Sequence, residues 1–313
     1  LTRKQANNAK EGEITNGCIF LQQKEYSQDV LKDQHEIKFV IAPQLTTTSP
    51  QMFCKCKLLE EVFAPNLLEI KSAEQSFQQE RFQNTALTEA CFPQLGRVGR
   101  QTFMHCTKLV EVHFAACQNV AAGAFGYCSA LTNVRLENAR TIEKWAFNGC
   151  TSLINVHLPL CEKLEDGAFS YCYKLSNLKM KNAKEIGGQV FAHCPALKLL
   201  SLPVCETLGG GAFFNCASLK YLNIRNLKLS EVSLSCFAGC KSLIQIDTNL
   251  KTDQFVCLDE TCSKLKNCPI CSGTINSCFV PHSLNKLMAN RKPAMLKLRH
   301  CLNASNQLMK QIP

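Results

Sequence analysis

The stretch from Ala146 to Pro159 reads Ala-Phe-Asn-Gly-Cys-Thr-Ser-Leu-Ile-Asn-Val-His-Leu-Pro. Its pattern recurs along the chain, because phenylalanines stand 22 residues apart and each has a cysteine three positions later. The phenylalanines are Phe103, Phe125, Phe147, Phe169, Phe191 and Phe213, and the cysteines are Cys106, Cys128, Cys150, Cys172, Cys194 and Cys216. Self-similarity at a fixed period of this size is typical of a repeat protein. We number each unit from its phenylalanine as position 0.

Each unit contains an apolar alternation. In the unit that starts at Phe147, positions 9 and 11 are Val156 and Leu158, whereas positions 8 and 10 are Asn155 and His157. Apolar and polar residues that alternate in this way predict a short strand with one buried face. A single unit of 22 residues cannot bury its own apolar side chains. Successive coils must therefore stack on one another.

The repeat extends outward from these central units. Further units start at Leu31, Phe53, Arg81, Phe237 and Asp259, with six extra residues near Glu74 and two near Ser230. In this frame Asn84 replaces the cysteine of the unit that starts at Arg81. The chain then divides into an N-terminal cap or disordered segment at 1–30, a solenoid at 31–281 and a basic helical C-terminal cap at 282–313.

The unit quoted above resembles the BspA-type (Treponema-like) leucine-rich repeat, whose motif reads Ala-Phe-x-x-Cys-x-x-Leu-x-x-Val-x-Leu-Pro. The segment from Phe279 to Leu284 also resembles the one that often follows the last repeat in this family. The resemblance implies an α/β repeat solenoid, a right-handed horseshoe or arc of about eleven 22-residue coils with a parallel strand on the concave face. It implies a non-catalytic protein-binding scaffold, which many microbial members display at the cell surface. It supplies no catalytic residues.

The cysteines are unusually many, at 21 in 313 residues. Nine of them share position 3, and an in-register column of this kind indicates thiols packed inside the coils as small apolar side chains. They are Cys56, Cys106, Cys128, Cys150, Cys172, Cys194, Cys216, Cys240 and Cys262. Cys117, Cys161 and Cys205 share position 14 but are two coils apart, so we expect no bridges among them.

A second group of cysteines lies toward the C-terminus. Cys268 and Cys271 have the spacing with which two thiolates can bind one zinc ion, and Cys262 and Cys278 could complete the ligand set. A labile disulfide, a thiol-redox site and ordinary buried thiols are the alternatives. Because a second well-spaced pair is missing, we expect no cofactor, and a zinc-binding or redox module stays an alternative.

The exposed strand positions of the central units form the candidate binding surface. In curved leucine-rich repeats positions 8 and 10 line the concave face, where a partner would bind. Here they form an asparagine column and a basic or titratable column, flanked by two large side chains. The residues are Glu111, His113, Asn133, Arg135, Asn155, His157, Asn177, Lys179, Leu199 and Tyr221.

These features favour a protein or peptide partner over other ligands. The sequence has no nucleophile elbow, phosphate-binding glycine loop or paired carboxylates, so we expect neither an enzyme nor a small-molecule substrate. The face lacks the interleaved aromatic residues of a single-strand nucleic-acid groove, which argues against nucleic acid. The formal charge of +10 arises mostly after residue 260, so a basic tail in contact with an anionic membrane is an alternative to a cap.

The compartment stays open at this point. No apolar run reaches the roughly 20 residues that a membrane span requires. The chain starts at Leu1, so we expect a cytoplasmic protein if there is no signal peptide, and a cell-surface adhesin if one has been removed.

Overall fold

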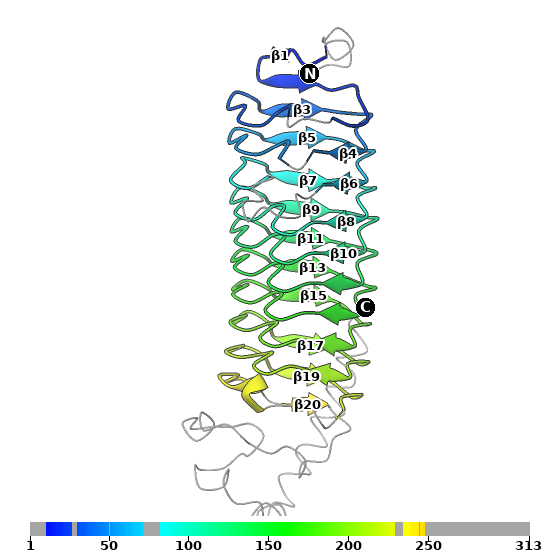
Figure 1. Ribbon diagram of the computed structural model, residues 1–313. Helices are drawn as coiled ribbons and strands as arrows, with labels where there is room; N and C mark the ends of the chain where they lie inside the picture. The colour runs from blue at the N-terminus through cyan, green and yellow to red at the C-terminus, as the bar shows by residue number, and fades with distance from the viewer. Residues whose placement is uncertain are drawn as a thin grey trace, which may run out of the picture.

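The computed structural model describes residues 11–26, 30–49, 51–71, 82–228, 234–243 and 245–247. Its short strands form two columns along a stack of coils (Figure 1). The first column contains β2 (Cys18–Phe20), β3 (Phe39–Ile41), β5 (Glu61–Phe63), β7 (Glu89–Cys91), β9 (Glu111–His113), β11 (Asn133–Arg135), β13 (Asn155–His157), β15 (Asn177–Lys179), β17 (Leu199–Ser201), β19 (Tyr221–Asn223) and β20 (Gln245–Asp247). The second contains β4 (Thr47–Thr48), β6 (Glu69–Ile70), β8 (Arg97–Val98), β10 (Asn119–Val120), β12 (Thr141–Ile142), β14 (Lys163–Leu164), β16 (Glu185–Ile186) and β18 (Thr207–Leu208).

The strands of each column pair in parallel, with residues of the same repeat position side by side. In β11 and β13, for example, Asn133 pairs with Asn155 and Val134 with Val156. The second column forms one continuous sheet of eight strands, whereas the first is divided into three sheets by interruptions after β5 and after β15. The repeat period of the sequence is therefore the stacking period of the structure.

The third side of each coil contains turns in place of a regular helix. The amide of Phe125 donates to the carbonyl oxygen of Ala146 at 2.7 Å, and the amide of Tyr127 donates to that of Asn148 at 2.8 Å. These backbone bonds join one coil to the next, so they are not available for a helical turn within the coil. In the described part of the chain the helical element is the 3₁₀ turn η2 (Leu234–Phe237).

The molecule is thus a β-solenoid of about 9 turns with little helix. The expected α/β class is not confirmed, because backbone bonds between coils occupy the side where helices were expected. The count of eleven coils is not confirmed either, since the unit that starts at Asp259 lies outside the described residues. In the view of Figure 1 the coils form a nearly straight column.

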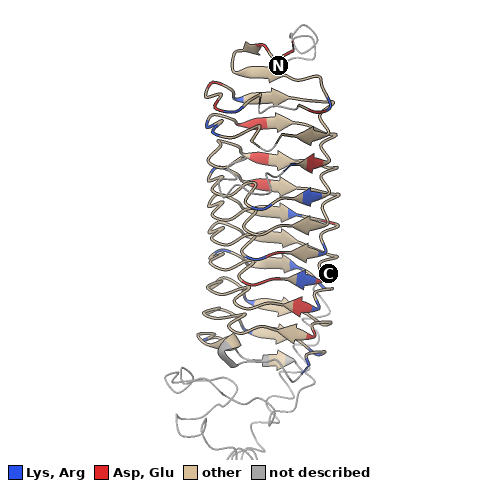
Figure 2. Cartoon of the chain, in the orientation of Figure 1, with Lys and Arg blue, Asp and Glu red and all other residues tan. Residues whose placement is uncertain are grey.

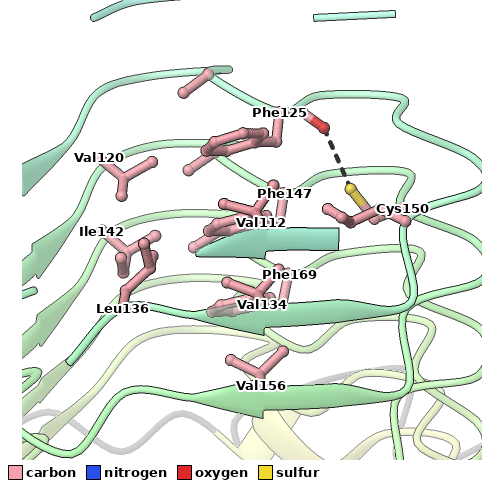
Figure 3. Close-up of a cluster of buried hydrophobic side chains, with 14 of the residues drawn as sticks. Val112, Val120, Phe125, Val134, Leu136, Ile142, Phe147, Cys150, Val156 and Phe169 are labelled. Carbon is pink, nitrogen blue, oxygen red and sulfur yellow. Dashed lines mark hydrogen bonds between the residues drawn. The ribbon is translucent and has the colours of Figure 1, made fainter. Parts of the chain in front are cut away.

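A stack of phenylalanine rings forms the centre of the core. The rings of Phe125 and Phe147 are 5.0 Å apart with an interplanar angle of 3°, and those of Phe147 and Phe169 are 5.1 Å apart at 1°. Figure 3 shows these rings beside Val112, Val134 and Val156. All of these side chains are buried, which confirms the inward direction predicted for position 9 and places position 0 in the core as well.

One unit starts at a different residue from the one predicted. The ring of Phe82 lies in the stack, 4.5 Å from that of Phe53 and 4.9 Å from that of Phe103. The predicted start at Arg81 is therefore wrong by one residue, because a shortened turn allows a ring to enter the stack. It follows that Thr85, and not Asn84, occupies the cysteine position, where its hydroxyl lies 3.8 Å from the Cys106 thiol.

The N-terminal end adds a strand to the first column. β2 pairs in parallel with β3, and β1 (Ile14–Thr15) pairs with β2 in the antiparallel sense. Residues within the expected segment 1–30 thus extend the stack. The expected C-terminal cap at 282–313 lies outside the described residues.

Candidate functional site

The exposed residues of the first column form one surface, which we call the strand face. It consists of the outward side chains of β5 to β15, two from each strand. Asn155 and Lys179 are exposed and His157 is half-buried. Val156, which lies between Asn155 and His157, is buried. The alternation predicted from sequence is therefore present in the structure.

A groove lies on the strand face across four successive strands. Its volume is about 440 Å³, and its lining comes from β9, β11, β13 and β15. The lining residues are Glu111, Asn133, Val134, Arg135, Asn155, Val156, His157, Asn177 and Lys179. The structure thus brings seven of the ten predicted site residues into one hollow. His113 lies beside it on β9, whereas Leu199 and Tyr221 belong to another sheet.

The asparagine column makes hydrogen bonds within itself. The Asn155 amide donates to Oδ1 of Asn133 at 2.7 Å, and the Asn177 amide donates to Oδ1 of Asn155 at 3.0 Å. We expected these amides to face an extended partner. Part of their hydrogen-bonding capacity is instead used between strands, which holds the floor of the groove in one arrangement. Each amide nitrogen has a second hydrogen that can still be donated.

The titratable column contains two contacts with one carboxylate that the sequence did not indicate. Glu137, two residues after β11, lies 3.3 Å from Arg135 Nη2 and 3.4 Å from His113 Nε2. The Glu137 carboxylate therefore anchors the two side chains on either side of it. His157 and Lys179, which both line the groove, have no ion pair among the described residues.

Acidic side chains occupy the neighbouring part of the strand face. Glu61, Glu89 and Glu111 are the first residues of β5, β7 and β9, and all three are exposed. Glu89 and Glu111 are direct partners in the parallel ladder. Figure 2 shows this acidic run on β5 to β9, followed by basic residues on β11 and β15. Glu61 and Glu89 occupy position 8 of the upstream units in the sequence frame, so the repeat pattern could have identified them.

The strand face ends at an interruption after β15. β15 and β17 belong to different sheets, while the second column continues through β14, β16 and β18. The rings of Phe169 and Phe191 are 6.0 Å apart, compared with 5.1 Å for Phe147 and Phe169. Leu178 at this place is only partly buried. The two coils thus lose their pairing on the strand face while the second column stays paired, and the groove does not extend beyond β15.

A ladder of alternating charge lies on another side of the coils. It occupies position 15 of five units and consists of Arg140, Glu162, Lys184, Glu206 and Lys228. Glu162 accepts from Arg140 Nη1 at 2.7 Å and from Lys184 Nζ at 3.1 Å. Lys184, and then Arg140, lower the pKa of Glu162 below its usual range. The sequence contains this ladder at a spacing of 22, and testing position 15 for charge would have found it.

The cysteines of the described part are free thiols, and most are buried. Burial raises the pKa of Cys150 and of Cys161 to about 12. Cys117, Cys161 and Cys205 are unbridged, as expected. Among the described residues no three His, Cys, Asp or Glu side chains are grouped so that they could hold a metal ion. Cys262, Cys268, Cys271 and Cys278, the predicted zinc ligands, lie outside those residues.

The described coils also contain no helix with the length and apolar character of a membrane span.

Comparison with known proteins gives a family. The family described as the BspA type leucine rich repeat region matches residues 75–198 and 162–285, with 6 copies of the repeat. No curated protein matches the chain.

Several solved structures are similar in fold. A leucine rich cell surface protein from Faecalibacterium prausnitzii is 18% identical with a TM-score of 0.37, and the alignment covers 76% of this chain and 80% of that one. The leucine rich repeat protein of T. pallidum is 22% identical with a TM-score of 0.38, covering 53% and 72%. A leucine-rich repeat protein from Eubacterium ventriosum is 13% identical with a TM-score of 0.42, covering 75% and 83%.

Proposed function

Because this chain belongs to the BspA-type leucine-rich repeat family, we propose that it is a non-catalytic scaffold that binds a protein or peptide partner on its strand face. The observation that supports this proposal is the groove of about 440 Å³, whose lining side chains come from four adjacent strands. A partner that lies in it would contact several coils at once.

The groove is held in shape before any partner binds. The Asn155 amide bonds to Asn133 and accepts from Asn177, and Glu137 anchors Arg135. Side chains that are already fixed lose less conformational entropy on binding. His157 and Lys179 remain available to recognise the partner. The ordered floor and the available side chains together favour recognition of a defined surface.

The chemistry of the coils favours binding over catalysis. Cys150 and Cys161 have a pKa of about 12 because they are buried, so both thiols are protonated at neutral pH. A protonated thiol is a poor nucleophile and a poor metal ligand. The groove itself is lined by amides, a carboxylate, a guanidinium, an imidazole and an ammonium group, which are suited to hydrogen bonds and ion pairs.

Site-directed photo-crosslinking tests the proposal. A photoreactive amino acid replaces Lys179 in one protein and Lys174 in a second, and each is illuminated in an extract of the source cells. Both positions are exposed, but Lys179 lines the groove and Lys174 does not. We expect discrete adducts, identified by mass spectrometry, from position 179 and none of the same mass from position 174.

A charge-reversal pair serves as the matched control. Arg135→Glu with Lys179→Glu changes the groove, whereas Lys108→Glu with Lys174→Glu changes the net charge equally at exposed positions outside it. The first pair should remove binding of the partner identified by crosslinking, and the second should retain it. Equal binding to both pairs, or equal adducts at positions 179 and 174, would refute the proposal.

Two alternative functions differ from this proposal in where the protein is displayed or in which residues act. A cell-surface adhesin would use the same strand face, and it differs only in where the protein is displayed. A zinc or thiol-redox module would use Cys262, Cys268, Cys271 and Cys278. Metal analysis of protein purified without chelator, compared with Cys268→Ser, tests the latter, because a zinc site would give stoichiometric metal that the variant loses.

A further inference from the structure

The acidic residues of the strand face are arranged so that they repel one another. Glu89 and Glu111 are direct ladder partners on β7 and β9, and Glu61 begins β5, the preceding strand of the first column, across the interruption between the two sheets. Neighbouring strands lie about 4.8 Å apart. None of the three carboxylates has an ion pair among the described residues. Like charges directly opposite each other destabilise a sheet, and a cationic partner would relieve this repulsion.

The basic residues follow on the next strands of the same face. Arg135 ends β11 and Lys179 ends β15, with His157 between them at the end of β13. Arg135 contacts Glu137 through one nitrogen at 3.3 Å, which leaves other guanidinium donors available. Lys181, two residues after β15, is also exposed. An anionic group would therefore find donors from three adjacent strands.

The charges are consequently separated along the axis of the solenoid. Figure 2 shows acidic residues on β5, β7 and β9 and basic residues on β11 and β15. A partner that crosses the strands would meet one sign and then the other. The paired strands from β7 to β15 span about 19 Å at the usual strand spacing, and β5 lies one further step away, so an extended peptide needs at least roughly eight residues to reach from β5 to β15.

We infer that the partner presents an extended segment of two charge blocks, with basic residues over Glu61, Glu89 and Glu111 and acidic residues over Arg135, His157 and Lys179. This inference rests on the function proposed above and adds the chemistry of the partner to it. Complementary charge order fixes the position of such a segment on the face and disfavours a shifted one. The asparagine column lies beside the basic residues on β11, β13 and β15 and can bond to the segment's main chain.

Two synthetic peptides of equal composition test the charge order. The first reads Lys-Lys-Lys-Gly-Gly-Glu-Glu-Glu and the second Lys-Glu-Lys-Gly-Glu-Gly-Lys-Glu, each with a fluorescent label. Their binding to the full chain is measured by fluorescence anisotropy at low salt and at physiological salt. We expect the blocked peptide to bind about tenfold more tightly at low salt, and the difference to shrink as salt screens the charges.

Variants show whether the strand face is responsible. Glu89→Lys with Glu111→Lys should abolish the preference for the blocked peptide. Glu36→Lys with Glu69→Lys makes the same change of charge at exposed positions outside the strand face and should leave the preference unchanged. Circular dichroism of each variant checks that the coils are intact.

The outcomes separate this inference from the proposed function. Equal affinity for the two peptides, or a preference that survives Glu89→Lys with Glu111→Lys, overturns the charge order. If the crosslink at position 179 is still formed in that case, partner binding at the strand face stands and only its chemistry is wrong. If the crosslink is absent while the blocked peptide is preferred, the proposed function fails, and the charge order describes the surface alone.

Discussion

The thiol of Cys150 donates a hydrogen bond of 3.1 Å to the carbonyl oxygen of Phe125 in the preceding coil (Figure 3). The same bond recurs along the column, at 3.0 Å from Cys128 to Phe103 and at 3.3 Å from Cys172 to Phe147. The thiols are thus donors that join one coil to the next, as well as the small apolar side chains that the sequence indicated. This explains why cysteine, and not alanine, occupies position 3.

Substitutions of Cys150 distinguish a donor from an apolar filler. Cys150→Ala removes the bond to Phe125 and leaves a small void, so we expect a loss of about 1–3 kcal/mol in the free energy of unfolding. Cys150→Ser keeps a donor at the same place and should lose less. Urea unfolding followed by circular dichroism measures both. If serine is the more harmful of the two, the thiol acts mainly through its apolar character.

Much of the fold follows from the sequence, because one period governs it. The phenylalanine stack, the parallel register and the inward direction of Val112, Val134 and Val156 all repeat at 22 residues. Features that depend on a single unit were not predictable in this way. The shift to Phe82 depends on a turn one residue shorter, and the interruption after β15 depends on how two particular coils pack.

The candidate site was predicted in part for the same reason. Its residues lie at fixed positions of the repeat, so the frame placed Asn155, His157 and Lys179 side by side. The bonds among the asparagines and the contact of Glu137 with Arg135 depend on side-chain conformation, which a period does not determine. The scarcity of helix in the described coils depends on backbone bonds such as the one that joins Phe125 to Ala146, and no residue pattern signals these directly.

Stability should fall at alkaline pH. Burial raises the pKa of Cys56, Cys150 and Cys240 from 9.0 to about 12 in the folded protein. The folded state then holds protons that the unfolded state releases above pH 9, so the stabilisation is complete below pH 9 and is lost as the pH rises toward 12. Each thiol contributes a loss of about 1.4 kcal/mol per pH unit in this interval.

Urea unfolding at a series of pH values checks this dependence. The wild-type midpoint should be level below about pH 9 and should fall steeply above it. Cys150→Ala removes one titrating group, so the free energy of unfolding of this variant should fall less steeply with pH, by the contribution of one thiol. Tyrosine and lysine side chains titrate equally in both proteins, and identical slopes would therefore contradict the assignment to thiols.

The thiols should differ widely in reactivity. Cys91 at the end of β7 is exposed, whereas Cys150 is fully buried. The raised pKa of Cys150 alone lowers its thiolate fraction about 1000-fold relative to a thiol with the ordinary value of 9.0. Brief alkylation of the native protein, followed by peptide mapping, should modify Cys91 and leave Cys150 unmodified. Similar labelling of both before unfolding would show that the coils open readily.

The asparagine column should contribute to stability in proportion to its hydrogen bonds. Asn155 makes two of them within the column, to Asn133 and from Asn177, while Asn177 makes one. Because these side chains are exposed, we expect Asn155→Ala to cost about 1 kcal/mol and Asn177→Ala about half of that. Thermal unfolding of the two variants measures the ratio. An equal loss of stability in the two variants would mean that the second hydrogen bond of Asn155 adds nothing to stability.

Trp145 is the single tryptophan of the chain, so its fluorescence reports on the contact between its indole and Gly167. Gly167 has a φ of +65°, and a Cβ placed on it would lie 2.7 Å from Trp145 Nε1. Gly123→Ala is the matched control, because its φ is +64° and its Cβ would meet only Gln101 Cγ at 3.3 Å. Both variants should lose about 1–2 kcal/mol from the left-handed backbone. Gly167→Ala must also displace the indole, so it alone should lose more stability and shift the emission of Trp145 to longer wavelength. An unchanged spectrum in Gly167→Ala would show that the indole does not rest on this glycine.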